Sequence, residues 1–288
     1  MLSLTAAVAV RRAIARREFV LHTQPIVGCS SGKIEAAEAL IRWRHPHRGL
    51  LAPGEFLPAI RSRGLTRAFN LHVLELAIEH RDVWRTSGIS LPLSVNVTPA
   101  CLADERFLLG VERLTATRSP LGEVRFEVTE HATVSGGVAL DHSVERLRRD
   151  GFEFLLDDFG AEYSSLSRLA SLPFSSLKID GSLVAGLTET REHRSIVHAA
   201  IHLAHTLGLK AVAERVESMS TWKLLHALGC DQIQGYFIAR PMPAEDFPAW
   251  ARQYVPAPPD ALLRRTEDRR ASGDRRSGAD RRTDPART

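Results

Sequence analysis

Residues 155–166 read LLDDFGAEYSSL, and this stretch joins a strand to a cluster of charge. Its two leucines end an apolar run, residues 152–156, that is typical of a buried strand. Two adjacent carboxylates, Asp157 and Asp158, follow the run directly. Neighbouring like charges are costly unless a cation lies between them, although Asp and Gly are also ordinary turn residues. The choice between a turn and a cation site depends on how the other strands end.

Strand-like and helix-like patterns alternate through residues 1–255. Strand–helix units repeated over about 250 residues predict an α/β fold, a (β/α)8 TIM-like barrel, with a doubly wound sheet as the alternative. Only GCSSG, residues 28–32, separates the first two strands, so we expect the barrel to begin with an antiparallel pair. The predicted strands are 19–27, 34–43, 91–97, 124–129, 152–156, 176–179, 211–213 and 232–236, and the predicted helices are 53–63, 68–86, 139–150, 192–207 and 220–228.

The composition is that of a globular chain. Of the 288 residues, 44% are hydrophobic, enough for one large domain or two small ones. No apolar run is long enough to span a membrane. The N-terminal stretch places its arginines after a short apolar segment, which indicates an amphipathic helix and not a secretory signal. The three cysteines are odd in number and widely spaced, so they predict no disulfide framework. We expect a cytoplasmic protein.

The net charge of +4 resides in the C-terminal tail. Residues 261–288 hold nine arginines against five acidic residues, and the triplet Asp-Arg-Arg recurs three times among Ser, Gly and Ala. Such a composition cannot bury a core. We therefore predict a folded domain over residues 1–255 and a disordered, Arg-rich tail over residues 256–288. The tail is interpreted as a solubilising segment or as a contact for an acidic partner, RNA or membrane.

Polar side chains recur where the predicted strands end. In a barrel these ends meet at one mouth, where catalytic groups lie. Several carboxylates together with carboxamides, without histidine or cysteine, favour hard divalent cations such as Mg²⁺ or Mn²⁺ over zinc. Two such cations about 4 Å apart serve in-line displacement at phosphorus, and a lysine beside them can orient water or stabilise phosphoryl charge. The residues are Glu38, Asn96, Glu127, Glu130, Asp157, Asp158, Lys178, Glu214, Glu217 and Gln234.

The motifs around these residues resemble the EAL-domain family of bacterial signalling proteins, the cyclic di-GMP phosphodiesterases. The triplet that names the family is Glu38-Ala39-Leu40, within EAAEALIRWRHP. The resemblance covers residues 15–250, and its motifs recur in the family's order. They are TQPIV, SVNV, FEVTE, DDFG, SSLKID, AERVE and QGYFIARPMP.

The resemblance implies a barrel with a reversed first strand and a metal-dependent reaction. Water would hydrolyse cyclic di-GMP to the linear dinucleotide pGpG at a pair of Mg²⁺ or Mn²⁺ ions. One ion would be held by Glu38, Asn96, Glu127 and Asp157. The second ion would be shared by Asp157 and Asp158.

The remaining polar groups also receive roles from the resemblance. Glu214 matches the general base, and Lys178 matches the group that holds the nucleophilic water or a phosphate oxygen. Arg42, whose fork of donors suits phosphate, and Gln24 match substrate contacts. The supporting groups are Gln234 and Glu217 beside the site and Glu130, which anchors the loop after the paired aspartates.

Two positions depart from the family pattern. Glu162 and Arg215 each stand where the family has glycine, a residue that often marks positive φ or close backbone approach. Glu162 is expected to strain a loop used for metal binding and dimer contacts. Arg215 is expected to lower the pKa of Glu214 or to block the pocket. Because every implied ligand is present, we favour an active enzyme; the alternative is a catalytically weak or inactive EAL module that acts as a cyclic di-GMP receptor or protein-interaction domain.

Further expectations concern assembly and two neighbouring residues. The resemblance implies a homodimer. Few residues precede position 15, and only the tail follows position 255, which suggests a stand-alone EAL domain regulated through partners, dimerisation or expression. Tyr236 is expected in the core, and Asp180 either caps a strand end or contacts a guanine edge.

Overall fold

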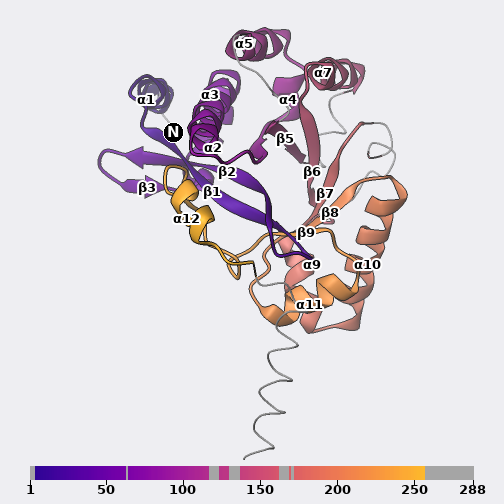
Figure 1. Ribbon diagram of the computed structural model, residues 1–288. Helices are drawn as coiled ribbons and strands as arrows, with labels where there is room; N and C mark the ends of the chain where they lie inside the picture. Colours follow the sequence, from indigo (N-terminus) through magenta and orange to yellow (C-terminus); the bar gives the residue numbers. More distant parts are fainter. Residues whose placement is uncertain are drawn as a thin grey trace, which may run out of the picture.

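The computed structural model describes residues 4–62, 64–116, 123–129, 137–161, 169 and 172–256. Within these residues, eight strands form a closed ring in the order β1, β9, β8, β7, β6, β5, β4, β2, with β10 and β3 attached outside it (Figure 1). The ring closes because β1 pairs with both β2 and β9, which excludes the open, doubly wound sheet. The strands are β1 Phe19–Gly28, β2 Ile34–His45, β3 Gly49–Leu51, β4 Leu93–Asn96, β5 Val124–Thr129, β6 Glu153–Phe159, β7 Ser176–Ile179, β8 Lys210–Ala213, β9 Gln232–Ile233 and β10 Met242–Pro243.

Helices pack around the outside of the ring (Figure 1). Their inward faces join one continuous apolar core with the strands. The described helices are α1 Leu4–Ala15, α2 Pro53–Ser62, α3 Thr66–Thr86, α4 Pro99–Leu102, α5 Glu105–Thr115, α7 Gly137–Arg149, α9 Gly181–Ala185, the 3-10 helix η2 Gly186–Thr188, α10 Arg191–Thr206, α11 Met219–Ala227 and α12 Phe247–Gln253.

The first strand runs against its neighbours, as the short turn predicts. β1 is antiparallel to β2 and to β9, and the turn is closed by Gly28, whose N–H donates to the carbonyl of Lys33 at 2.9 Å. In this register Gln24 lies opposite Glu38. The hairpin therefore brings a residue from the middle of β1 to the side of the EAL triplet.

The other seven ring strands are parallel from β2 through β4, β5, β6, β7, β8 to β9. Parallel pairing sends every carboxyl end to the same rim. The register sets Glu38 beside Ser94, and Asn96 beside Glu127. Asp157 lies beside Thr129 at the next pair. The fold thus gathers residues that lie 119 positions apart, from 38 to 157, in one layer of the barrel.

Among the described helices, α4, α5, α9 and α12 were not predicted from the pattern. Helix α5 contains Gly110, which lowers helix propensity, but a Cβ at this position would collide with the side chain of Leu71 on α3. The glycine therefore permits close packing of α5 on α3. Helix α12 packs on α3: Trp84 of α3 stacks on Phe247 of α12 at a centroid distance of 4.3 Å, and the Trp84 indole N–H donates to the carbonyl of Ala244.

Several expectations fall on other parts of the chain. Glu130, Glu162 and residues 257–288 lie outside the described residues, so the loop anchor and the Arg-rich tail stay predictions. Among the helices that the structure describes, none has the length and the apolar composition needed to cross a bilayer.

Candidate active site

An irregularity in β6 lets the paired aspartates act together. Regular alternation along a strand would point Asp157 and Asp158 to opposite faces. The pairing of β6 with β7 shifts between Leu156 and Phe159, and Asp158 adopts a positive φ of 59°. Aspartate tolerates this left-handed conformation better than most residues, and a bulge of this kind re-aims a side chain. The DDFG motif therefore encodes a bulge in β6, where a turn had been the alternative.

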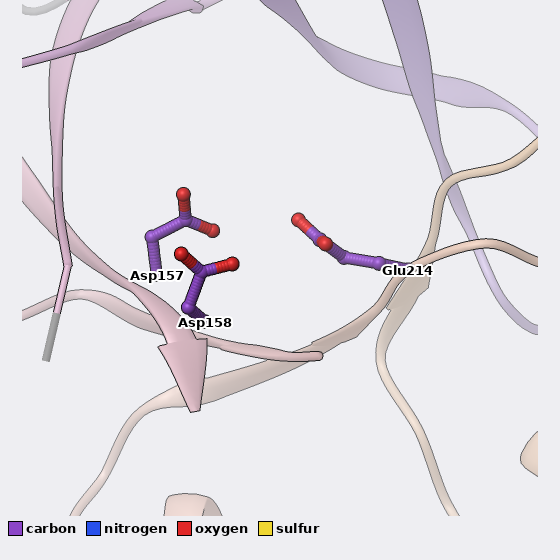
Figure 2. Close-up of side chains that lie close together, drawn as sticks. All are labelled: Asp157, Asp158 and Glu214. Atoms are coloured by element: carbon purple, nitrogen blue, oxygen red, sulfur yellow. The ribbon is translucent and has the colours of Figure 1, made fainter. Parts of the chain in front are cut away.

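Three carboxylates meet as a result of this bulge. Figure 2 shows Asp157 and Asp158 side by side, with Glu214 reaching toward them from the end of β8. One oxygen of each carboxylate lies within 4.8 Å of one oxygen of the other two, a spacing that suits a metal ion. We refer to Asp157, Asp158 and Glu214 as the acidic trio.

Below the trio, a buried lysine joins four carboxylates. Lys178 is 1% exposed, and its Nζ lies 2.7 Å from Glu214, 2.8 Å from Glu127, 3.0 Å from Asp157 and 3.4 Å from Glu38. One ammonium cannot balance four carboxylates. The centre therefore keeps an excess of negative charge in a place where water is scarce.

Neutral amides orient two of these carboxylates. Gln234 Nε2 donates to Glu38 at 2.8 Å and to Gln24 Oε1 at 3.1 Å. Asn96 Nδ2 donates to the other oxygen of Glu38 at 3.1 Å and to Glu127 at 3.4 Å. These contacts join the sequence-predicted residues Gln24, Glu38, Asn96, Glu127 and Gln234 in one network.

Ser94 belongs to the same network and was not singled out in the sequence. Its hydroxyl donates to Glu127 from the neighbouring strand β4. The signal was available, because Ser94 stands two residues before Asn96 in SVNV and side chains two apart on a strand share a face.

The excess negative charge is visible in the pKa values. Burial, reinforced by Glu38, raises the pKa of Glu127 well above its ordinary value. Burial also raises the pKa of Glu214 to about 7, and burial together with Asp157 raises that of Asp158. For Lys178, burial would lower the pKa, but the surrounding carboxylates outweigh it and raise the pKa well above the usual value. Lys178 therefore stays charged, but the carboxylates around it have too few cationic partners to balance their negative charge.

The donor set fits divalent cations. Asp157 Oδ1 and Gln234 Oε1 are buried and receive no hydrogen bond from the part of the chain that the structure describes. Asp157 Oδ1 lies 3.0 Å from Lys178 Nζ but not in hydrogen-bond geometry. Unsatisfied buried oxygens are rare in folded proteins. Together with the acidic trio and the charge excess, they match the oxygen ligands that Mg²⁺ and Mn²⁺ prefer.

A cavity of about 460 Å³ opens above the trio. Its wall includes Gln24, Arg42 and Glu217, three further residues that the sequence assigned to the site. Gln24 is nearly buried and its Nε2 donates to the carbonyl of Ala239 at 3.0 Å, whereas Glu217 is exposed. Burial lowers the pKa of Arg42, although Tyr236 and Glu38 oppose this effect.

The structure corrects one expectation and bears on two others. Tyr236 is 50% exposed and lines the cavity, with the guanidinium of Arg240 4.3 Å from its ring centroid, so its placement in the core was wrong. The pKa of Glu214 is raised, chiefly by burial, so the net lowering expected beside Arg215 does not occur. Asp180 caps helix α9, since its carboxylate accepts from the N–H of Ser182 at 2.9 Å.

Arg215 has an unusual backbone conformation. Its φ is 52°, which costs roughly 1–2 kcal/mol for a residue other than glycine. The resemblance of the sequence implies glycine at this position, and glycine adopts a positive φ without this strain. The side chain of Arg215 lies against Gly181, where a Cβ would collide with its Cγ and Cδ atoms.

The raised pKa of Glu214 makes a prediction for the metal-free protein. Its folded value is about 7, against an ordinary 4.5, so the stabilising effect of its proton is full below pH 4.5 and is lost as the pH rises through 7. Between pH 5 and pH 8 the free energy of unfolding should fall by roughly 1–3 kcal/mol more in the wild type than in Glu214→Gln. Urea unfolding with a chelator at both pH values measures this difference, and parallel pH dependences of the two proteins would refute it.

Comparison with known proteins assigns a family to this geometry. The EAL domain model matches residues 7–241. A cyclic di-GMP phosphodiesterase of Pseudomonas aeruginosa is 35% identical over 236 residues, which are 82% of this chain and 40% of that protein. The cyclic di-GMP phosphodiesterase RocR of the same organism is 34% identical over 239 residues, which are 83% of this chain and 61% of RocR. The chain thus spans less than two thirds of the length of either relative.

Solved structures agree with the sequence comparison. The PaMucR phosphodiesterase in complex with c-di-GMP has a TM-score of 0.79 and 36% identity, and the match covers 84% of this chain and 99% of that one. The EAL domain of DcpA from Mycobacterium smegmatis has a TM-score of 0.68 and 32% identity, with coverages of 82% and 97%. The chain therefore belongs to the EAL-domain family of cyclic di-GMP phosphodiesterases.

Proposed function

We propose that this protein hydrolyses cyclic di-GMP to pGpG with the help of divalent cations. The observation that carries the proposal is the acidic trio above Lys178, in a cavity that also holds Arg42. Two of the relatives are named cyclic di-GMP phosphodiesterases, and one similar structure is a complex with c-di-GMP. Cleavage of this second messenger would lower the signalling that depends on it.

The cations would be Mg²⁺ or Mn²⁺, two per site, because the donors around the acidic trio are oxygen atoms. One would be held by Glu38, Asn96, Glu127 and Asp157, and the second by Asp157 and Asp158. When bound, they supply a Lewis acid that withdraws charge from the phosphoryl oxygens and makes water more acidic.

Glu214 is the proposed general base. Its carboxylate lies at the mouth with its side chain 19% exposed, and its pKa of about 7 is close to the working pH, where a base is most effective. It would take a proton from the water whose oxygen attacks phosphorus in line with the departing 3′ oxygen. The new P–O bond gives the 5′ phosphate of pGpG, and the 3′ oxygen leaves with a proton from solvent.

Three further residues would position the reactants. Lys178 would hold Glu214 and Asp157 in place and lend positive charge beneath the phosphate, since it lies 2.7 Å and 3.0 Å from their oxygens. Arg42 would bind a phosphate of the substrate through its fork of donors. Gln24 would support the site through Gln234, to which it is hydrogen-bonded.

Removal of divalent cations is expected to abolish turnover, and addition of Mg²⁺ or Mn²⁺ to restore it. Asp158→Asn should raise the cation concentration for half-maximal activity by roughly tenfold or more, because a ligand of the second ion is lost. Asp180→Asn is a matched control: it removes a nearby negative charge that raises the pKa of Asp158 but leaves the trio intact. Equal cation requirements of the two variants, or turnover in excess chelator, would contradict the proposal.

The second candidate is a receptor that binds cyclic di-GMP without cleaving it. The strained backbone of Arg215 at the mouth favours it, and the complete ligand set opposes it. Retention of intact cyclic di-GMP by the cation-loaded protein would support the receptor.

We also propose that the protein is a homodimer, which light scattering tests. The Arg-rich tail is proposed to contact an acidic partner. This association should weaken as the salt concentration rises and should be lost when residues 261–288 are deleted.

A further inference from the structure

Arg215 is a cation that the family pattern does not supply. It follows Glu214 directly, lines the cavity and is exposed. Its alkyl stem lies against Gly181 at the start of α9, where there is room only because Gly181 lacks a Cβ. Its backbone holds a positive φ of 52°. A strained residue with a charged head at the mouth of a site is a candidate for a role in that site.

The acidic groups of the cavity that the structure describes do not form an ion pair with the guanidinium of Arg215. The cavity wall contains five carboxylates and two arginines, Arg42 and Arg215. With the described residues, Arg215 forms no ion pair, although Glu214 and Glu217 are its neighbours in sequence. The guanidinium of Arg215 is therefore not paired with the described carboxylates of the cavity and can contact a ligand.

The two arginines lie on different sides of the mouth. Arg42 is on β2 and Arg215 follows β8, and in the ring β9 and β1 stand between these strands. The acidic trio lies at the ends of β6 and β8. A cyclic dinucleotide carries two phosphates in its ring and one base at each end. In the proposed function one phosphate lies over the trio; if Arg42 binds the other phosphate, the group left for Arg215 is a base.

We infer that Arg215 recognises a guanine of the substrate, through its O6 and N7 atoms; this inference rests on the proposed function. The two parallel N–H donors of a guanidinium match the two acceptors on that edge of guanine. Adenine presents an amino donor at the corresponding position and would face Arg215 with a mismatch. Arg215 is thus a specificity residue that favours guanine over adenine.

The test compares cyclic di-GMP with its analogue in which N7 of both guanines is replaced by C–H. Arg215→Gly, which is compatible with the positive φ, should raise KM for cyclic di-GMP by on the order of 10- to 100-fold with little change in kcat. The wild type should have a higher KM for the analogue than for cyclic di-GMP, whereas Arg215→Gly should have the same KM for both. Arg215→Lys keeps the charge without the fork and should recover only part of the affinity.

The other outcomes overturn the inference. If Arg215→Gly weakens both substrates equally and the wild type does not distinguish them, Arg215 binds phosphate and not the base. If Arg215→Gly leaves KM unchanged or improves it, the side chain restricts the cavity and recognises nothing. Thermal unfolding of each variant separates these effects from loss of the fold. A wild type that neither binds nor hydrolyses cyclic di-GMP would refute the proposed function itself, a result distinct from the other two.

Discussion

Replacing Glu214 by glutamine is expected to lower kcat for cyclic di-GMP hydrolysis by roughly 10²- to 10⁴-fold, the usual contribution of a general base. Glutamine has the same shape and can still accept a hydrogen bond from Lys178, which lies 2.7 Å from the carboxylate. It cannot accept the proton of the attacking water. The change therefore removes one chemical step and leaves the rest of the site in place. Steady-state kinetics at pH 8 with Mg²⁺ measures the loss.

The matched control for this variant is Glu217→Gln. Glu217 lines the same cavity, is exposed and stands three residues further along the chain, so its replacement removes an equal charge without touching the trio. Because Glu217 is a supporting group outside the trio, its replacement should lower kcat far less than Glu214→Gln does, and both variants should still bind cyclic di-GMP. A Glu214→Gln protein as active as Glu217→Gln would exclude Glu214 as the base.

Replacing Lys178 by methionine should destabilise the metal-free protein by about 3–5 kcal/mol at pH 8, the cost of leaving buried charges without their partner. Methionine fills a similar volume but offers no charge to Glu38, Glu127, Asp157 and Glu214. Because burial already raises the pKa values of Glu127 and Glu214, protonation relieves part of the repulsion, and the loss should be smaller at pH 5. Urea unfolding in a chelator at the two pH values measures it, and turnover should be abolished.

Lys210→Met provides the control for the loss of a lysine. Lys210 begins β8, is exposed, and its nearest described acidic partner is Glu35 at 3.9 Å, so its removal should change stability by less than about 1 kcal/mol. Equal stabilities of the Lys178 and Lys210 variants would show that the buried ammonium does not hold the four carboxylates together.

The repeated strand ends made most of the candidate site predictable from sequence. A parallel barrel sends every such end to one rim, so the positions of Glu127, Lys178 and Glu214, at or near the ends of β5, β7 and β8, follow from topology. Glu38 lies in the interior of β2, where it pairs with β1 and β4. Gln24 required one more step, the reversal of β1, which the five-residue turn indicated.

The local backbone could not be predicted in the same way. Adjacent aspartates on a regular strand point apart, and only the bulge with a positive φ at Asp158 brings them together. The last strand was predicted to reach Tyr236 but ends at Ile233. A Cβ on Gly235 would collide with the backbone of Val216, so the chain approaches closely and turns there. Tyr236 consequently leaves the core and faces the cavity.

Lys178 shows a second limit of prediction from the sequence. Its place at the end of β7 followed from the LKID motif, but its burial among four carboxylates depends on side chains from β2, β5, β6 and β8. The pKa of Glu214 depends on the same burial and charges. Such collective properties belong to the folded site and to no single motif.

The most direct measurement is chromatographic separation of the products formed from cyclic di-GMP by the purified protein with Mg²⁺ or Mn²⁺, beside Glu38→Ala and Glu214→Gln. The account expects pGpG to accumulate with the wild type and to be absent with both variants. Full recovery of intact cyclic di-GMP from wild-type protein that binds it would contradict the account and identify the protein as a receptor.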